Sequence, residues 1–132
     1  MLDEVESVVP EGVNTLMYAD DVTLFTQHRE KASAVELLQT AVDRVAYWSK
    51  VKKMQLNTEK SEVTFFSSDS REAMWTPSVT LNGKHMPYNP NQKFLGVYLD
   101  RTLCFSHHVE VVTRKASARC NILASLARKT WG

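Results

Sequence analysis

The chain has 132 residues, of which 43% are hydrophobic and 23% charged, so it is long enough for one globular domain and too short for a large multidomain enzyme. No apolar run approaches the roughly 18 residues that span a bilayer, and the acidic start MLDEVESVVP is unlike a signal peptide, so we expect a soluble intracellular protein. Six acids and no Lys or Arg lie in residues 1–28, whereas six bases and one acid lie in residues 101–132. This asymmetry is typical of a cation site followed by a polyanion-binding region, or it is the ordinary drift of a short sequence.

A β-hairpin is predicted over residues 14–26, NTLMYADDVTLFT, because two β-branched and aromatic runs meet at a short acidic turn. Asp20 and Asp21 then lie side by side at its tip. Adjacent carboxylates repel each other, and a divalent cation such as Mg²⁺, which prefers oxygen ligands, removes the conflict. Two such ions can stabilise the attacking and leaving oxygens of a phosphoryl transfer. The alternative is a solvent-exposed turn, in which aspartate is common.

A long helix is predicted over residues 29–53, where the pattern changes to apolar residues spaced by three and four. The residues on that face are Val35, Leu38, Val42, Val45 and Ser49. Ser33 and Glu36 form an S-x-x-E capping pair that marks the helix start, unless the helix begins a turn earlier.

Short strands and turns are predicted in the middle of the chain. In order, they are a turn at 57–60, a strand at 62–66, a loop at 67–76, strands at 79–81 and 85–88, and a strand at 93–99. The pair Asn82-Gly83 is a strong hairpin signal, because both central positions of a type I′ turn require a positive φ.

A final helix is predicted from about residue 107 to 129, with Ser106 as its cap. Its apolar stripe consists of Val109, Val112, Ala116, Cys120, Leu123 and Ala127. The basic residues that point away from this stripe are Arg114, Lys115, Arg128 and Lys129. Cys104 and Cys120 have no C-x-x-C spacing and are expected to be reduced, partly buried thiols. The order of elements predicts an α+β fold with antiparallel sheet.

Three stretches in this order, LMYADDVTLF, MQLNTEKSEVTFF and KFLGVYLD, resemble the reverse transcriptases and, within them, the polymerases of non-LTR retrotransposons. The first resembles the Y-x-D-D hairpin of the palm, the second the L-N-x-x-K-[ST] segment, and the third the F/Y-L-G strand before the thumb. The resemblance extends from about residue 12 to 128. It implies an antiparallel palm-type sheet with a packing helix, followed by a thumb helix. Residues 1–100 would then form a partial palm, and residues 101–132 the start of the thumb.

The resemblance also implies roles for individual residues. Asp20 is similar to the metal-binding carboxylate that nucleotidyl transfer requires, and Asp21 to its less strictly required neighbour, so that both would hold Mg²⁺ or Mn²⁺. Tyr18 resembles the tyrosine beside the primer end and the incoming nucleotide. Lys60 resembles the lysine near the leaving pyrophosphate, where a cationic donor neutralises developing charge; a solvated turn lysine is the alternative.

Nucleic-acid contacts are implied in the last third of the chain. The residues similar to the family's primer grip are Phe94, Leu95 and Gly96, although core packing is the alternative for the first two. The candidates for phosphate contacts are Arg114, Lys115, Arg128 and Lys129, with a solvated polar face as the alternative.

The implied activity is RNA-directed DNA synthesis by two-metal nucleotidyl transfer, with an RNA template, a DNA primer and deoxynucleoside triphosphates as partners. The family's other metal-binding Asp, its Q-G segment and its fingers normally precede the Y-x-D-D hairpin, and the seventeen residues before Tyr18 contain none of them. We therefore expect the chain to be inactive alone, unless another chain supplies that part in trans. A non-catalytic nucleic-acid-binding module and a degenerate remnant with a structural role remain as alternatives. The resemblance implies a nuclear or nucleoprotein-associated location and no membrane.

Overall fold

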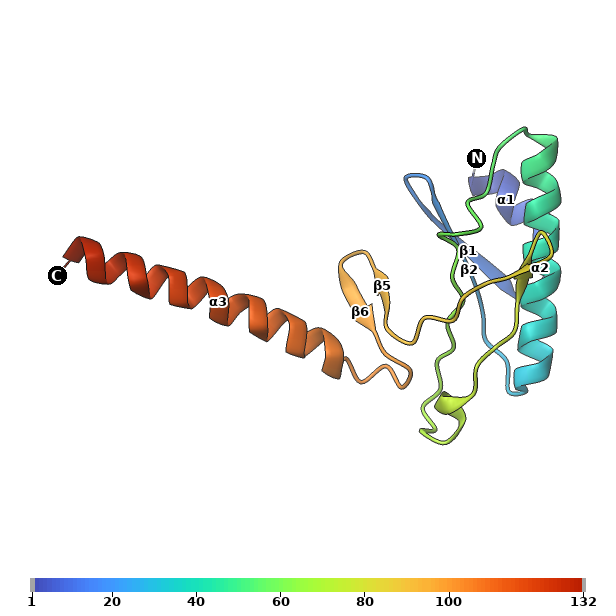
Figure 1. The fold of residues 1–132 in the computed structure, drawn as a ribbon. Helices are drawn as coiled ribbons and strands as arrows, with labels where there is room; N and C mark the ends of the chain where they lie inside the picture. The colour runs from blue at the N-terminus through green and yellow to red at the C-terminus, as the bar shows by residue number, and fades with distance from the viewer. Residues whose placement is uncertain (1, 132) are drawn as a thin grey trace. The chain divides into compact units, whose positions relative to one another are not determined.

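The computed structural model describes the backbone of residues 2–131, and the side chains of these residues except 2, 3, 73 and 128–131 (Figure 1). The predicted α+β class is confirmed, because helices alternate with short antiparallel strand pairs. The chain forms two compact units, Met1–Val63 with Pro77–Tyr88 and Thr64–Thr76 with Asn89–Gly132. These units interleave along the sequence, and the division into palm and thumb at residue 100 stays a prediction from the resemblance.

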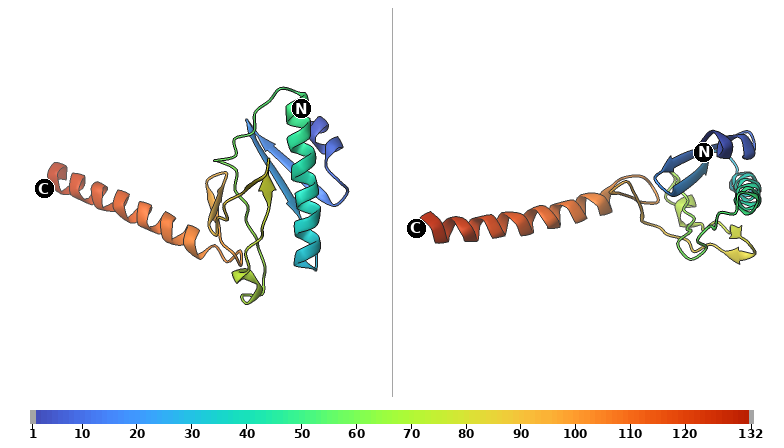
Figure 2. Two further views of the ribbon diagram at one scale, coloured as in Figure 1. Left: turned by 45° about the vertical axis from the view of Figure 1, so that its right-hand side comes forward. Right: turned by 90° about the horizontal axis from the view of Figure 1, so that it is seen from above.

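The first unit is built around one long helix. Its elements are α1 (Leu2–Val8), β1 (Val13–Tyr18), β2 (Asp21–Thr26), α2 (Lys31–Val51), β3 (Thr80–Leu81) and β4 (Lys84–His85). The predicted first hairpin is confirmed: β1 and β2 pair antiparallel, from Val13 opposite Thr26 to Tyr18 opposite Asp21. Helix α1, both strands of this hairpin and β3 all contact α2, and Figure 2 shows the hairpin running alongside the helix.

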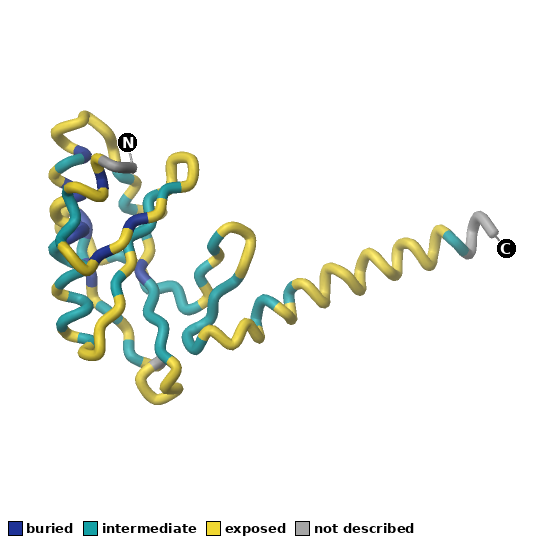
Figure 3. The backbone as a smooth tube through the Cα atoms, turned by 180° about the vertical axis from the view of Figure 1, so that it is seen from behind, coloured by how far each residue is buried: buried dark blue, intermediate teal, exposed yellow. Residues whose placement is uncertain are grey.

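The core of this unit lies along one face of α2, as its apolar spacing predicts. The buried residues of the helix are Ala41, Val42, Val45, Ala46 and Ser49. Val42 and Ala46 form one cluster with Val63, Val79 and Leu81, and Val35 and Leu38 pack against it. In Figure 3 the buried positions gather in this unit. Burial of this stripe therefore holds α2 against the β3–β4 hairpin.

The start of α2 differs from the predicted capping pair. Glu30 occupies the cap position without a side-chain cap bond, and the Ser33 hydroxyl instead donates to the Glu30 carboxylate at 3.3 Å. The capping pair of Ser33 and Glu36 is thus wrong as a start signal, and the earlier of the two predicted starts is confirmed. The first bond of the helix runs from the Ala34 N–H to the Glu30 carbonyl at 3.1 Å, so the helix already begins before Ser33.

The Asn82-Gly83 hairpin is confirmed, with φ of 52° at Asn82 and 80° at Gly83. The amide of Gln39 attaches this hairpin to α2. Its oxygen accepts the backbone N–H of Thr80 at 2.8 Å, and its nitrogen donates to the Thr80 carbonyl at 2.9 Å. A glutamine side chain thus takes the place of a neighbouring strand along β3.

Two strand predictions are wrong. Residues 62–66 form no ladder strand; Val63 makes only an isolated parallel bridge to Tyr88. Residues 93–99 form a hairpin, in which β5 (Gln92–Phe94) pairs antiparallel with β6 (Val97–Leu99). The chain reverses at Leu95 and Gly96, whose φ values are 49° and 85°. Positive φ at both central positions is the type I′ pattern, and it divides an apolar run that looks continuous in the sequence.

The rest of the second unit consists of a loop with one 3₁₀ turn (Glu72–Met74) and the helix α3 (Ser106–Trp131). The predicted loop at 67–76 is confirmed apart from this turn. The Val109 N–H bonds the Phe105 carbonyl at 2.9 Å, so Phe105 occupies the cap position and the predicted cap at Ser106 is wrong.

The apolar stripe of α3 is present but uncovered. Every side chain from residue 112 to 126 is exposed, and Leu123 keeps 65% of its surface accessible. Cys104 and Cys120 are exposed as well, against the expectation of partly buried thiols. No helix in the described part of the chain is both long and apolar enough to cross a bilayer.

Candidate active site

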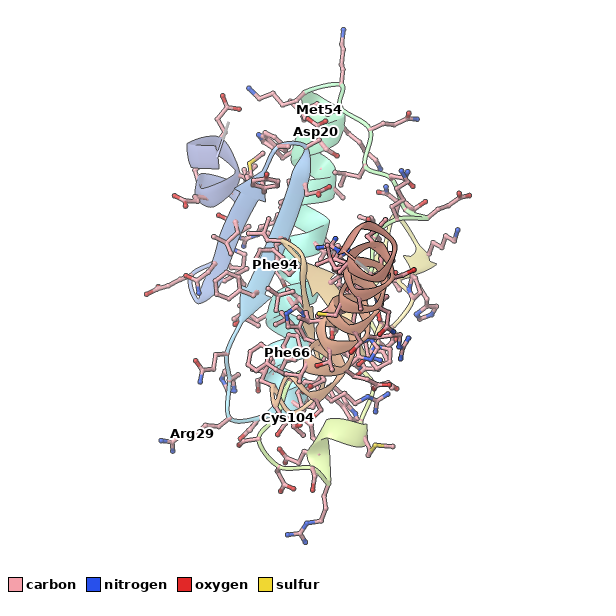
Figure 4. The ribbon with its side chains drawn as sticks, turned by 90° about the vertical axis from the view of Figure 1, so that its left-hand side faces the viewer. Asp20, Arg29, Met54, Phe66, Phe94 and Cys104 are labelled. Atoms are coloured by element: carbon pink, nitrogen blue, oxygen red, sulfur yellow. The ribbon has the colours of Figure 1, made fainter. Side chains whose placement is uncertain are left out.

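The two adjacent aspartates lie at the tip of the first hairpin. Tyr18 pairs with Asp21, so Ala19 and Asp20 form a two-residue turn. Ala19 has a φ of 53°, whereas the φ of Asp20 is not positive. A positive φ at the first central position alone is the pattern of a type II′ turn. Both aspartates are exposed, and Figure 4 shows Asp20 at the turn between the strands. The turn therefore presents two consecutive carboxylates to solvent.

The chemistry of this pair fits a divalent cation. None of the ion pairs in the described residues involves Asp20 or Asp21. Carboxylate oxygens are the ligands that Mg²⁺ prefers, and two carboxylates fill part of its roughly six positions. No group of three or more His, Cys, Asp or Glu side chains in the described part could hold a metal ion. The hairpin thus offers part of a cation site, in need of further ligands.

An apolar surface adjoins the carboxylates on the hairpin. In β1, Val13 and Thr15 are buried, whereas the alternate residues Leu16 and Tyr18 are exposed. Tyr18 keeps 65% of its surface accessible, directly before the turn. Because alternate side chains of a strand point to opposite faces, one face of the hairpin packs inward and the other carries Tyr18 into solvent.

Lys60 lies in a turn of the same unit. The Asn57 side-chain oxygen accepts the backbone N–H groups of Glu59 at 3.0 Å and Lys60 at 3.2 Å, and the Ser61 hydroxyl donates to the Asn57 carbonyl at 2.7 Å. This local network explains the turn that the sequence predicts at 57–60. The Lys60 side chain is exposed, and no hydrogen bond or ion pair within the described residues joins it to the aspartates.

The predicted primer-grip residues lie at the tip of the β5–β6 hairpin. Phe94 is half-buried, whereas Leu95 keeps 61% of its surface accessible. No atom lies within 4 Å of the position that a Cβ on Gly96 would occupy. Core packing is therefore excluded as the role of Leu95, and the tip is open to a close approach of another backbone.

The basic residues of α3 differ in their surroundings. Arg114 donates to the Glu110 carboxylate at 3.0 Å, one turn back, and Lys115 is exposed. Arg119 is a further exposed base on this helix that the sequence interpretation omitted, although its place one turn after Lys115 was a sufficient signal. The side chains of Arg128 and Lys129 lie outside the described residues.

The model of the family described as reverse transcriptase (RNA-dependent DNA polymerase) matches residues 1–99. This range includes the hairpin, α2, the second motif and the third motif except its last residue, Asp100. The chain belongs to this reverse transcriptase family. Its relatives include the RNA-directed DNA polymerases from the mobile element jockey of Drosophila melanogaster, 28% identical over 96% of this chain, and of Drosophila funebris, 32% identical over 70%. A probable RNA-directed DNA polymerase from transposon X-element of Drosophila melanogaster is 29% identical over 86%.

The match to these reverse transcriptases confirms the resemblance to polymerases of non-LTR retrotransposons. The chain spans only 13%, 10% and 12% of the length of these three relatives. No solved structure matches the chain.

Proposed function

We propose that this chain is a segment of a retrotransposon RNA-directed DNA polymerase and that its first hairpin provides carboxylates to the catalytic metal site. One observation carries this proposal: Asp20 and Asp21 are exposed at the tip of a two-residue turn, inside the region that matches the reverse transcriptase family. Outside this region an exposed acidic turn would be an ordinary surface turn, because aspartate is common in turns.

The proposed reaction joins the 3′ oxygen of a primer to the α-phosphorus of a deoxynucleoside triphosphate and breaks the bond to pyrophosphate. Asp20 and Asp21 would hold Mg²⁺ or Mn²⁺, which, when bound, stabilises negative charge on the reacting phosphate oxygens. The exposed ammonium of Lys60 would neutralise charge on the leaving pyrophosphate or supply a proton. Tyr18 would pack its exposed ring beside the primer end.

Nucleic-acid contacts are proposed for the second unit. The open tip at Leu95 and Gly96 would face the primer backbone, and the exposed bases of α3 would contact phosphates of an RNA template and its primer. In the cell, the chain would act in a nuclear or other nucleoprotein complex.

Metal binding can be tested on the chain itself. In ¹H–¹⁵N spectra, Mn²⁺ is expected to broaden the amide signals of residues 18–21 selectively, because a paramagnetic ion relaxes nearby nuclei. The double variant Asp20→Asn, Asp21→Asn should lose this broadening. Glu36→Gln, which removes an exposed acid from α2, should keep it. Broadening that is uniform over the acidic surface, or that survives the double variant, would contradict the proposed site.

We further propose that the 132-residue chain alone does not polymerise. Two carboxylates are a partial ligand set, and the described residues hold no cluster that completes it. Purified chain with a primed RNA template, Mg²⁺ or Mn²⁺ and nucleotides should therefore show the same background incorporation as Asp20→Ala. Template-dependent incorporation that Asp20→Ala abolishes would overturn this expectation.

A non-catalytic nucleic-acid-binding module is the second candidate, favoured by the exposed bases Lys115 and Arg119 of α3. Affinity for a primer–template duplex should fall steeply with salt and survive Asp20→Ala. The double variant Lys115→Ala, Arg119→Ala should lower the slope of log affinity against log salt by roughly 1.5 to 2. Lys84→Ala, which removes an exposed base of the other unit, should leave the slope unchanged. Absence of any binding would favour the remaining alternative, a remnant with a structural role.

A further inference from the structure

The attachment of α3 within its unit depends on a small set of contacts. Strand β6 is the only strand or helix of the second unit that α3 contacts in the described residues. From residue 112 to 126 every side chain of the helix is exposed, so its first turns provide the attachment. The contacts between β6 and these first turns therefore hold the helix within its unit.

A histidine supplies the hydrogen-bond acceptor at this joint. The backbone N–H of Tyr98 in β6 donates to Nδ1 of His108 at 3.2 Å, and this contact is partly buried. The Tyr98 N–H is available because hydrogen-bonded and non-hydrogen-bonded pairs alternate along an antiparallel hairpin. Phe94 and Val97 flank the two-residue turn and form the hydrogen-bonded pair. The next pair, Lys93 and Tyr98, then points its backbone groups away from the partner strand. His108 thus occupies the place of a neighbouring strand on the outer edge of β6.

The geometry fixes the protonation state of His108. A backbone amide can only donate, so Nδ1 must carry a lone pair, and the ring must be neutral with its proton on Nε2. The imidazolium has a proton on both nitrogens, which would place two donors face to face. The bond is therefore present when the His108 ring is neutral and is lost when Nδ1 takes up a proton.

The surroundings of His108 contain other charged and titratable groups. The centres of the His108 and Tyr98 rings are 6.4 Å apart, and Tyr98 in turn contacts Lys93 of β5 and His107 of α3. In the loop between β6 and α3, the Cys104 thiol donates to the Asp100 carboxylate at 3.3 Å. The Lys93 ammonium lies 5.5 Å from the centre of the Tyr98 ring, and the His107 ring meets it edge to face at 5.0 Å. These aromatic contacts keep the side chains together but provide no second acceptor for the Tyr98 N–H.

We infer that His108 is the positioning residue that joins α3 to the β5–β6 hairpin, and that protonation of its ring releases this joint. This inference concerns the fold of the second unit and stands independently of the proposed polymerase function. It makes the order of the first turns of α3 depend on the protonation state of the His108 ring.

Nitrogen-15 NMR of the full chain tests this inference directly. At pH 8, His108 should show the tautomer with its proton on Nε2. On lowering the pH to 5, the Tyr98 amide signal should shift together with the His108 ring, and its protection from exchange, corrected for the intrinsic rate, should fall by about fivefold. A proton on Nδ1 at pH 8, or a Tyr98 amide that does not respond to the titration of His108, would overturn the inference.

Two variants separate His108 from its neighbour. His108→Asn offers a side-chain oxygen in place of Nδ1 and does not titrate, so the Tyr98 amide should remain protected from pH 8 to pH 5. His107→Phe keeps a ring against Tyr98, and the pH response should persist. If His107→Phe abolishes the response and His108→Asn does not, the assignment to His108 is wrong. Circular dichroism of each variant at pH 8 should match the parent chain, which shows that the fold is intact.

Discussion

Replacement of Gln39 by leucine is expected to detach the β3–β4 hairpin from α2. The Gln39 amide satisfies both backbone groups of Thr80, accepting from the N–H at 2.8 Å and donating to the carbonyl at 2.9 Å. Its nitrogen also donates to the Asp43 carboxylate at 2.9 Å. Leucine has a similar size but neither a donor nor an acceptor, so it would leave the partly buried edge of β3 without partners.

The expected loss in free energy of unfolding is about 2 kcal/mol. Each intramolecular hydrogen bond contributes roughly 0.5 to 1.5 kcal/mol net, and Gln39 makes two to the backbone of Thr80. With a urea dependence of about 2 kcal/mol per molar, typical of a small protein, the midpoint should fall by about 1 M.

Urea unfolding followed by circular dichroism measures this loss, and the exchange protection of the Thr80 amide locates it. Gln39→Glu keeps the acceptor but faces the Thr80 carbonyl with a carboxylate oxygen, so it should also destabilise the protein. Thr40→Ala is the matched control, because the Thr40 hydroxyl donates to the Glu36 carbonyl of its own helix, in an exposed contact, and makes no bond to β3 or β4 within the described residues. A Gln39→Leu variant within about 0.5 kcal/mol of the parent chain, with Thr80 still protected, would refute the reasoning.

Three further changes test other parts of the first unit. Gly12→Ala should lower the stability by about 1 to 2 kcal/mol, because φ is 93° and the new Cβ would lie 3.2 Å from Leu37 Cδ2; an unchanged urea midpoint would contradict this. Ala19→Gly should raise the stability by about 0.5 to 1 kcal/mol by relieving the positive φ at the hairpin tip, and a lower midpoint would show that the turn is not strained. The hydrogen bond from Lys52 at 3.0 Å holds the pKa of Glu4 below its ordinary value, so Lys52→Met should raise that pKa in a carbon-13 titration. This exposed pair contributes to the free energy of unfolding above the ordinary pKa of Glu4, and the contribution is lost as the pH falls through the lowered pKa of the folded protein. A Glu4 titration that is identical in both chains would exclude the contact.

Turns and amphipathic stripes were predictable because their causes lie within a few residues of each other. The Asn82-Gly83 turn follows from the freedom of both residues at positive φ, and the tip at Asp20 from the turn residues between two strand-forming runs. The buried face of α2 follows from the periodicity of its apolar residues. The family also follows from short motifs in order, which the match over residues 1–99 confirms.

The hairpin at 92–99 was not predictable in this way. Leu95 adopts a φ of 49°, which is unfavourable for a leucine by itself, and the turn is stabilised only when β5 pairs with β6. The run KFLGVYL therefore looks like one strand until the pairing is known. The missing ladder at 62–66 has the same origin, because a strand needs a partner that the local sequence does not specify.

The sequence by itself determined where the carboxylates lie, at the tip of a tight turn, because a turn depends on the backbone preferences of adjacent residues. The tertiary structure decided which groups surround them and which surfaces remain open. It left the α3 stripe uncovered, exposed Leu95 at the tip of its hairpin, and placed His108 against the Tyr98 N–H. Burial and hydrogen-bond partners join residues that are distant along the chain, so they follow from how the elements pack and not from local pattern.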